Sequence, residues 1–128
     1  MKSLFRVSSV FILLSVFACQ NPNEELYGEV MSIHDEVMPK MDDLYKAKQA
    51  LQKQLDTEEL DSIQQENVRE KIARINSASE QMMVWMRQFN PEGEREDSVR
   101  VYLESELVKI QKVRDDILQA LEANALSE

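Results

Sequence analysis

Residues 68–89 read VREKIARINSASEQMMVWMRQF, and the spacing of the apolar side chains in this stretch decides the fold. Steps of four and three residues alternate along one side of a helix, which is the seam of a heptad repeat with one polar gap at Ser79. The seam consists of Val68, Ile72, Ile75, Ser79, Met82, Met86 and Phe89. We therefore predict an amphipathic helix that packs against other helices, as in a coiled coil.

A second helical pattern precedes this stretch, from about Glu24 to Gln54. Its apolar stripe is Leu26, Val30, Ile33, Val37, Leu44, Leu51 and Leu55. Asp56 to Glu59 then reads as a turn in which Asp56 caps the next helix, which is expected to end near Phe89. Within the first helix, we expect Pro39 to cause a kink; the alternative is a split near Met38 into two shorter pieces.

A third pattern follows the break at residues 90–93, where Asp97 or Ser98 is expected to cap the helix. Its inward-facing residues are Val99, Leu103, Leu107, Ile110, Ile117 and Leu121. Because the connections are short, neighbouring helices should run antiparallel. The sequence therefore predicts an all-α domain over residues 25–128, an antiparallel three-helix bundle.

The start of the chain has the features of a secretory signal peptide. Lys2 and Arg6 precede an apolar run over residues 7–17, and polar sequence follows from Cys19 onward. This run has 11 residues, whereas a transmembrane helix needs about 20. We therefore expect residues 1–18 to be cleaved off rather than to remain as a membrane span.

The sequence Val16-Phe17-Ala18-Cys19 resembles the lipobox of bacterial lipoproteins. In that motif the cysteine takes a diacylglycerol on its sulfur, becomes the first residue after cleavage and is then acylated on its amine. The resemblance implies that Cys19 carries fatty acids of the palmitate type and that residues 19–24 hold it as a short tether. Cys19 is the chain's only cysteine, which excludes an intramolecular disulfide. The alternative is an ordinary signal peptidase that leaves Cys19 as a free thiol.

The charge of the cleaved chain restricts its partners. Cutting before Cys19 removes Lys2 and Arg6, which leaves 13 of the 15 basic residues against 24 acidic ones, a net charge of −11 over 110 residues. Such a surface repels nucleic acid and anionic lipid headgroups. Attachment to a bacterial membrane is therefore expected through the acyl chains at Cys19, on the periplasmic or surface side, with the outer membrane favoured.

Methionines gather in two short stretches, one in each of the first two predicted helices. Pairing these helices about a turn near Thr57 brings the two stretches and His34 to one end of the bundle. We expect no cofactor, and the alternative is a copper site, because thioether and imidazole ligands favour Cu(I). The candidate ligands are Met31, His34, Met82 and Met86. The alternative is that the methionines fill the core and that His34 bonds to Ser79 or Glu80.

Trp85 and Phe89 lie four residues apart and share one face of the second helix at the same end. They are a candidate interface for a partner, because tryptophan and methionine favour adaptable binding surfaces. Alternatively, the first and third helices cover both rings. The short tether would hold this end near the membrane, so the expected partner is a membrane or envelope protein.

The sequence offers little for catalysis, and we expect the protein not to be an enzyme. It has one histidine and its one cysteine is expected to be lipidated. It contains neither a glycine-rich phosphate loop nor a serine nucleophile motif.

Residues His34-Asp35-Glu36-Val37-Met38-Pro39-Lys40-Met41 and Met82-Met83-Val84-Trp85-Met86-Arg87-Gln88-Phe89 resemble stretches of small predicted lipoproteins of Bacteroidota. Those proteins are often labelled automatically as viral A-type inclusion proteins, a label that reflects coiled-coil composition. The resemblance assigns no activity and no role to any residue. We therefore expect a lipid-anchored envelope protein that acts as a non-enzymatic structural or protein-interaction module; the alternative is an envelope protein that binds Cu(I) or another soft metal.

Overall fold

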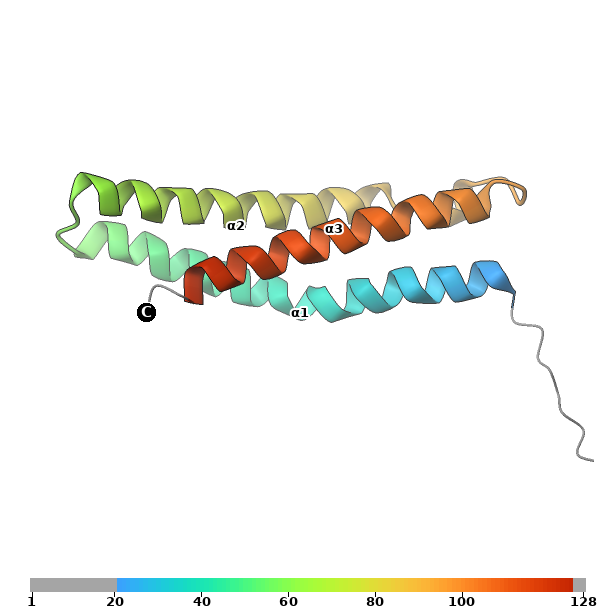
Figure 1. The fold of residues 1–128 in the computed structure, drawn as a ribbon, viewed down its shortest axis with the longest axis horizontal. Coiled ribbons are helices and arrows are strands. Elements are labelled where there is room, and N and C mark those ends of the chain that lie inside the picture. Colours follow the sequence, from blue (N-terminus) through green and yellow to red (C-terminus); the bar gives the residue numbers. More distant parts are fainter. Residues whose placement is uncertain (1–20, 126–128) are drawn as a thin grey trace, which may run out of the picture.

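The computed structural model describes residues 21–125, and this part of the chain forms three long α-helices and one short 3₁₀ helix. They are α1 (Pro22–Thr57), α2 (Ser62–Gln88), η1 (Pro91–Gly93) and α3 (Val99–Ala125). Consecutive long helices run antiparallel, so α1 and α3 are parallel (Figure 1). Each of the three contacts the other two, which confirms the predicted all-α three-helix bundle. Cys19 and the expected signal peptide over residues 1–18 lie outside the described residues.

Helix α1 begins at Pro22, two residues earlier than expected. The side chain of Asn21 accepts a hydrogen bond from the backbone N–H of Asn23, at 3.1 Å, and so caps the helix. Pro22 suits this first position, because its fixed φ is helical and it has no N–H to leave unsatisfied. Glu24 and Glu25 follow in the first turn, where carboxylates interact favourably with the helix dipole.

Helix α2 begins later than predicted, because Asp61 rather than Asp56 is its N-cap. The Asp61 carboxylate accepts from the backbone N–H of Gln64 at 2.8 Å, and the Gln64 side chain accepts from the Asp61 N–H at 3.0 Å. This capping box satisfies two backbone donors at once. Asp56 instead belongs to α1, which continues through Thr57.

The loop before α3 is braced by the two residues expected to cap that helix. Asp97 pairs with Arg95 at 2.6 Å, and the hydroxyl of Ser98 donates to the Arg95 carbonyl at 3.0 Å. Both side chains therefore act on the loop rather than on the first backbone N–H groups of α3.

Pro39 lies inside one continuous helix, so the alternative that α1 splits there is wrong. The helix changes direction near its middle (Figure 1), which agrees with the kink expected at Pro39, the eighteenth of its 36 residues. Pro39 itself is exposed, and its missing N–H leaves the Asp35 carbonyl without its usual helical partner. Helix α1 packs against both of the other long helices.

The core runs along the axis of the bundle and confirms five of the seven residues of the predicted α1 stripe, whereas Leu26 and Leu55 at its ends are only half-buried. Its buried residues there are Val30, Ile33, Val37, Leu44, Ala47 and Leu51. In α2 the buried seam passes through Val68, Ile75, Ala78, Met82 and Trp85. Ala78 and Trp85 replace the predicted Ser79 and Met86, which are only half-buried. The buried face of α2 therefore lies slightly to one side of the predicted seam, around the helix axis.

Helix α3 buries one charged residue among its apolar ones. Glu106 is 3 % exposed, beside the core residues Leu103 and Ile110. The ammonium group of Lys109 donates to its carboxylate at 2.7 Å. A buried carboxylate needs such a partner, because leaving it unpaired is costly.

Candidate functional site at the N-terminal end of the bundle

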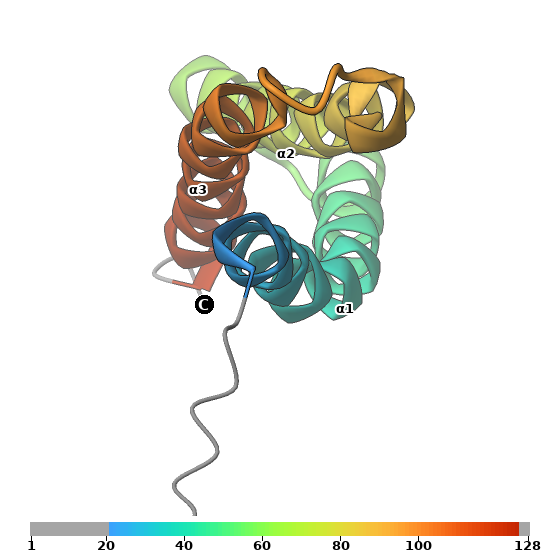
Figure 2. The same ribbon diagram turned by 90° about the vertical axis from the view of Figure 1, so that its right-hand side faces the viewer.

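An aromatic cluster joins the three helices at the end of the bundle where α1 begins. Phe89, the C-cap of α2, stacks on Trp85 with ring centroids 4.8 Å apart. The Phe89 ring also stacks with Tyr27 of α1 at 6.0 Å and with Tyr102 of α3 at 6.2 Å. Figure 2 looks onto this end, where the start of α1, the end of α2 and the start of α3 come together. Such ring pairs add to the stabilisation that burial alone provides.

The cluster borders an open cleft of about 520 Å³, which we call the N-terminal cleft. Its lining comes from the first turns of α1, the segment after α2 and the first turns of α3. The lining residues are Asn23, Glu24, Tyr27, Phe89, Asn90, Pro91, Glu92, Val99 and Leu103. The hydroxyl of Tyr102 accepts a hydrogen bond from the Asn90 N–H at 2.7 Å, which fixes one wall against α3.

Trp85 is a core residue, contrary to its assignment to an uncovered apolar patch. Its side chain is 5 % exposed and packs in the main hydrophobic cluster. Its indole Nε1 is buried without a hydrogen-bond partner among the described residues. Phe89 is half-buried and lines the cleft. Of the two predicted interface residues, Phe89 alone therefore presents a sizeable surface to a partner.

His34 lies beside Trp85, with ring centroids 6.0 Å apart, rather than beside Ser79 or Glu80. Its Nδ1 is hydrogen-bonded to the carboxylate of Asp35 at 2.9 Å. The expected partners were displaced because the loop between α1 and α2 is centred two to three residues beyond Thr57. That shift moves every facing pair along the hairpin by about one helical turn.

The four candidate copper ligands differ in access to solvent. Met82 is 0 % exposed, whereas Met31 and Met86 are half-buried and the His34 side chain is 20 % exposed. Within residues 21–125, no group of three or more His, Cys, Asp or Glu side chains is arranged to hold a metal ion. Met82, the most buried of the four candidate ligands, therefore acts as a core residue, as methionine does where it fills an irregular gap.

Tyr27 and Tyr102 were not among the predicted site residues, although both contact Phe89. Tyr27 precedes the buried Val30 by three residues, and Tyr102 directly precedes the buried Leu103. The signal that places them at the site is therefore their position at the start of two parallel helices. Sequence spacing puts them at this end, but only the packing shows that both rings meet the same phenylalanine.

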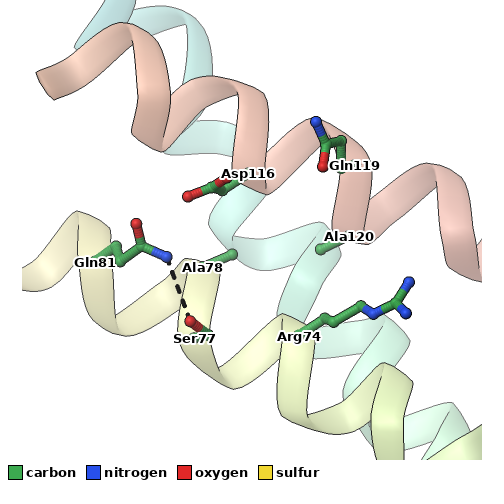
Figure 3. Close-up of a pocket in the computed structure, with 7 residues that line it drawn as sticks. All are labelled: Arg74, Ser77, Ala78, Gln81, Asp116, Gln119 and Ala120. Carbon is green, nitrogen blue, oxygen red and sulfur yellow. Dashed lines mark hydrogen bonds between the residues drawn. The ribbon is translucent and has the colours of Figure 1, made fainter. Parts of the chain in front are cut away.

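A second hollow, of about 320 Å³, lies between α2 and α3 toward the other end. It opens where the small side chains Ala78 and Ala120 face each other, as Figure 3 shows. In that view the Arg74 and Asp116 side chains lie at opposite ends of the hollow and point apart. Its charged groups therefore do not converge on one point where a small ligand would be held.

Comparison of the chain with models of protein families, with curated proteins and with solved structures found no match. Among residues 21–125, the helices are too polar for any of them to traverse a lipid bilayer.

Proposed function

We propose that the chain is a lipid-anchored protein of the bacterial cell envelope, with the outer membrane favoured, and that it acts as a non-enzymatic structural or protein-interaction module. The lipobox-like sequence ending at Cys19 supports the anchor. A cysteine of this kind carries several acyl chains, and each buried CH₂ contributes about 0.8 kcal/mol to membrane binding. Several chains therefore hold even a strongly acidic domain at a membrane.

The observation that carries the proposal is the start of α1 at Pro22, immediately after its N-cap Asn21. At 3.3–3.6 Å for each extended residue, the chain from Cys19 to Pro22 spans at most about 11 Å. An acylated Cys19 would therefore hold the N-terminal end of the bundle close to the bilayer. The cleft at that end would face partners that are themselves at the membrane surface.

Two measurements test the anchor and the orientation that follows from it. Cells expressing the chain are labelled with a radioactive or alkyne-bearing fatty acid, and we expect label on the wild-type chain but none on Cys19→Ser. Retention of label by Cys19→Ser, or a wild-type chain without label, contradicts the anchor.

The orientation is tested with spin labels on the acylated protein in vesicles. Because Cys19 is the only native cysteine, a cysteine introduced elsewhere is a unique thiol once Cys19 is modified. Glu29→Cys and Glu59→Cys place the label at exposed positions near opposite ends of α1. We expect nitroxide accessibility to report membrane proximity at residue 29 and open solvent at residue 59. Equal accessibility at both positions contradicts the proposed orientation.

A further inference from the structure

The N-terminal cleft has an apolar floor that is partly exposed. Tyr27, Phe89, Pro91 and Val99 contribute its exposed apolar surface, and the buried Leu103 lies beneath them. Tyr27 remains 44 % exposed there. The volume of about 520 Å³ falls within the usual range of ligand-binding clefts, about 300–1,000 Å³.

The walls of the cleft are fixed before any partner arrives. Phe89 is held on one side by the buried Trp85 and on the other by Tyr27. The next residue, Asn90, donates its N–H to the hydroxyl of Tyr102. A site that is ordered in advance loses little conformational entropy on binding, so its apolar contacts contribute more of their free energy to affinity.

The surroundings of the cleft are strongly acidic. Residues 21–29 and 89–99 contain seven carboxylate side chains and one basic side chain, Arg95. Arg95 is already paired with Asp97. Glu24 and Glu92 line the cleft itself. A groove surrounded by one sign of charge concentrates ligands of the opposite sign.

An apolar cleft near a membrane could hold a lipid, a second copy of the chain or a segment of another protein, and these charges favour the last of the three. Anionic lipid headgroups are repelled by the carboxylates. A second copy of the chain would bring the same acidic end against this one, and like charges placed together cost several kcal/mol. A segment with basic residues around an apolar one matches both the floor and its surroundings.

We propose that the N-terminal cleft binds a protein segment in which an aromatic or large aliphatic side chain is flanked by lysine or arginine. This inference rests on the proposed function for the location of the partner, at the membrane surface, and it names the chemistry of that partner. The apolar side chain enters the cleft beside Tyr27 and Phe89. The flanking cations lie near Glu24 and Glu92.

Short synthetic peptides test this chemistry on the cleaved, acylated protein in nanodiscs of neutral phosphatidylcholine. The probe is a fluorescent Lys-Lys-Phe-Leu-Lys-Lys peptide, followed by anisotropy. We expect it to bind at least about tenfold more tightly than Glu-Glu-Phe-Leu-Glu-Glu or Lys-Lys-Ser-Ser-Lys-Lys. Equal affinity for the two lysine peptides means attraction by charge alone and overturns the proposal.

Matched variants locate the binding. Tyr27→Ala is compared with Tyr45→Ala, which removes an exposed tyrosine from the same helix away from the cleft. Glu24→Gln/Glu92→Gln is compared with Glu59→Gln/Glu122→Gln, which neutralises two exposed carboxylates toward the other end. We expect each cleft variant to bind the probe about tenfold more weakly and each control to bind as wild type does. Equal effects of the cleft and control variants overturn the proposal.

The remaining outcomes distinguish this inference from the proposed function. A probe that binds Cys19→Ser but not the acylated protein shows that the chain's own acyl group fills the cleft, which overturns the proposed occupant. Fatty-acid labelling that succeeds while the peptide preference is missing overturns the inference alone. Peptide preference in a chain that is never acylated supports the cleft chemistry and overturns the anchor alone.

Discussion

The rings of Trp85 and Phe89 lie with their centroids 4.8 Å apart and their planes inclined by 23°. Trp85 is buried in the core, whereas Phe89 lines the N-terminal cleft. The pair therefore connects the stability of the bundle to the shape of its candidate binding surface. It also explains why Tyr27, and not Trp85, is the residue with which to test that surface.

Replacement of Trp85 by alanine should destabilise the fold. Removing a large buried aromatic side chain costs about 3–5 kcal/mol, because the surrounding core cannot fully collapse. Trp85→Phe should cost less, since it keeps most of the apolar contacts and removes an indole N–H that has no hydrogen-bond partner within residues 21–125. Urea unfolding followed by far-UV circular dichroism measures both changes. Wild-type stability in Trp85→Ala would show that the ring is not part of the core.

Glu106→Leu should leave the bundle as stable as the wild type or raise the free energy of unfolding by about 1 kcal/mol. The reason is that Glu106 is 3 % exposed beside apolar residues, so the carboxylate is desolvated in the folded state. Glu104→Leu, at an exposed position two residues earlier, is the matched control. A loss of more than about 1 kcal/mol specific to Glu106→Leu would mean that the core requires the carboxylate.

The ion pair of Glu106 and Lys109 should make stability depend on pH in the alkaline range. The hydrogen bond to Glu106 raises the pKa of Lys109 above its ordinary value of 10.5. The Lys109 ammonium therefore stabilises the fold fully at pH values below the pKa it has in the unfolded state. This contribution is lost as the pH rises through the pKa it has in the folded state. Unfolding of wild type and Lys109→Met should differ most near neutral pH and converge once the pH exceeds the raised pKa of Lys109. A difference that grows with pH would contradict the assignment.

Titration with Cu(I) under anaerobic conditions should show no binding tighter than micromolar. Met82 is fully buried in the core, so its thioether sulfur cannot join His34 in a metal site without rearrangement of the bundle. His34→Ala and Met82→Ala are the diagnostic variants. Submicromolar binding that both substitutions abolish would favour the copper-binding alternative over the interaction module.

Much of the fold followed from apolar spacing because a long amphipathic helix can bury only one side. The α1 stripe from Val30 to Leu51 was predicted correctly for this reason. In α2 the apolar pattern fits two adjacent seams. One has steps of four and then three residues, the other has steps of three and then four, and their members differ by one position. Packing selected Ala78 and Trp85 over Ser79 and Met86.

The candidate site was harder to predict, because it depends on the loop as well as on the helices. Asp56 and Asp61 both satisfy the local requirements of an N-cap, and only the second forms one. The resulting shift placed His34 against Trp85. The convergence of Tyr27 and Tyr102 on Phe89 requires three helices at defined rotations, which no local pattern specifies.

In the proposed arrangement, an acylated Cys19 holds the N-terminal end of the bundle at a membrane. Mass spectrometry of the N-terminal peptide, from protein purified out of the membrane fraction, measures this modification. We expect a peptide that begins at Cys19 and carries a diacylglycerol on sulfur and an acyl group on the amine. A peptide that begins elsewhere, or an unmodified Cys19 thiol, would show that Cys19 is not a lipid anchor.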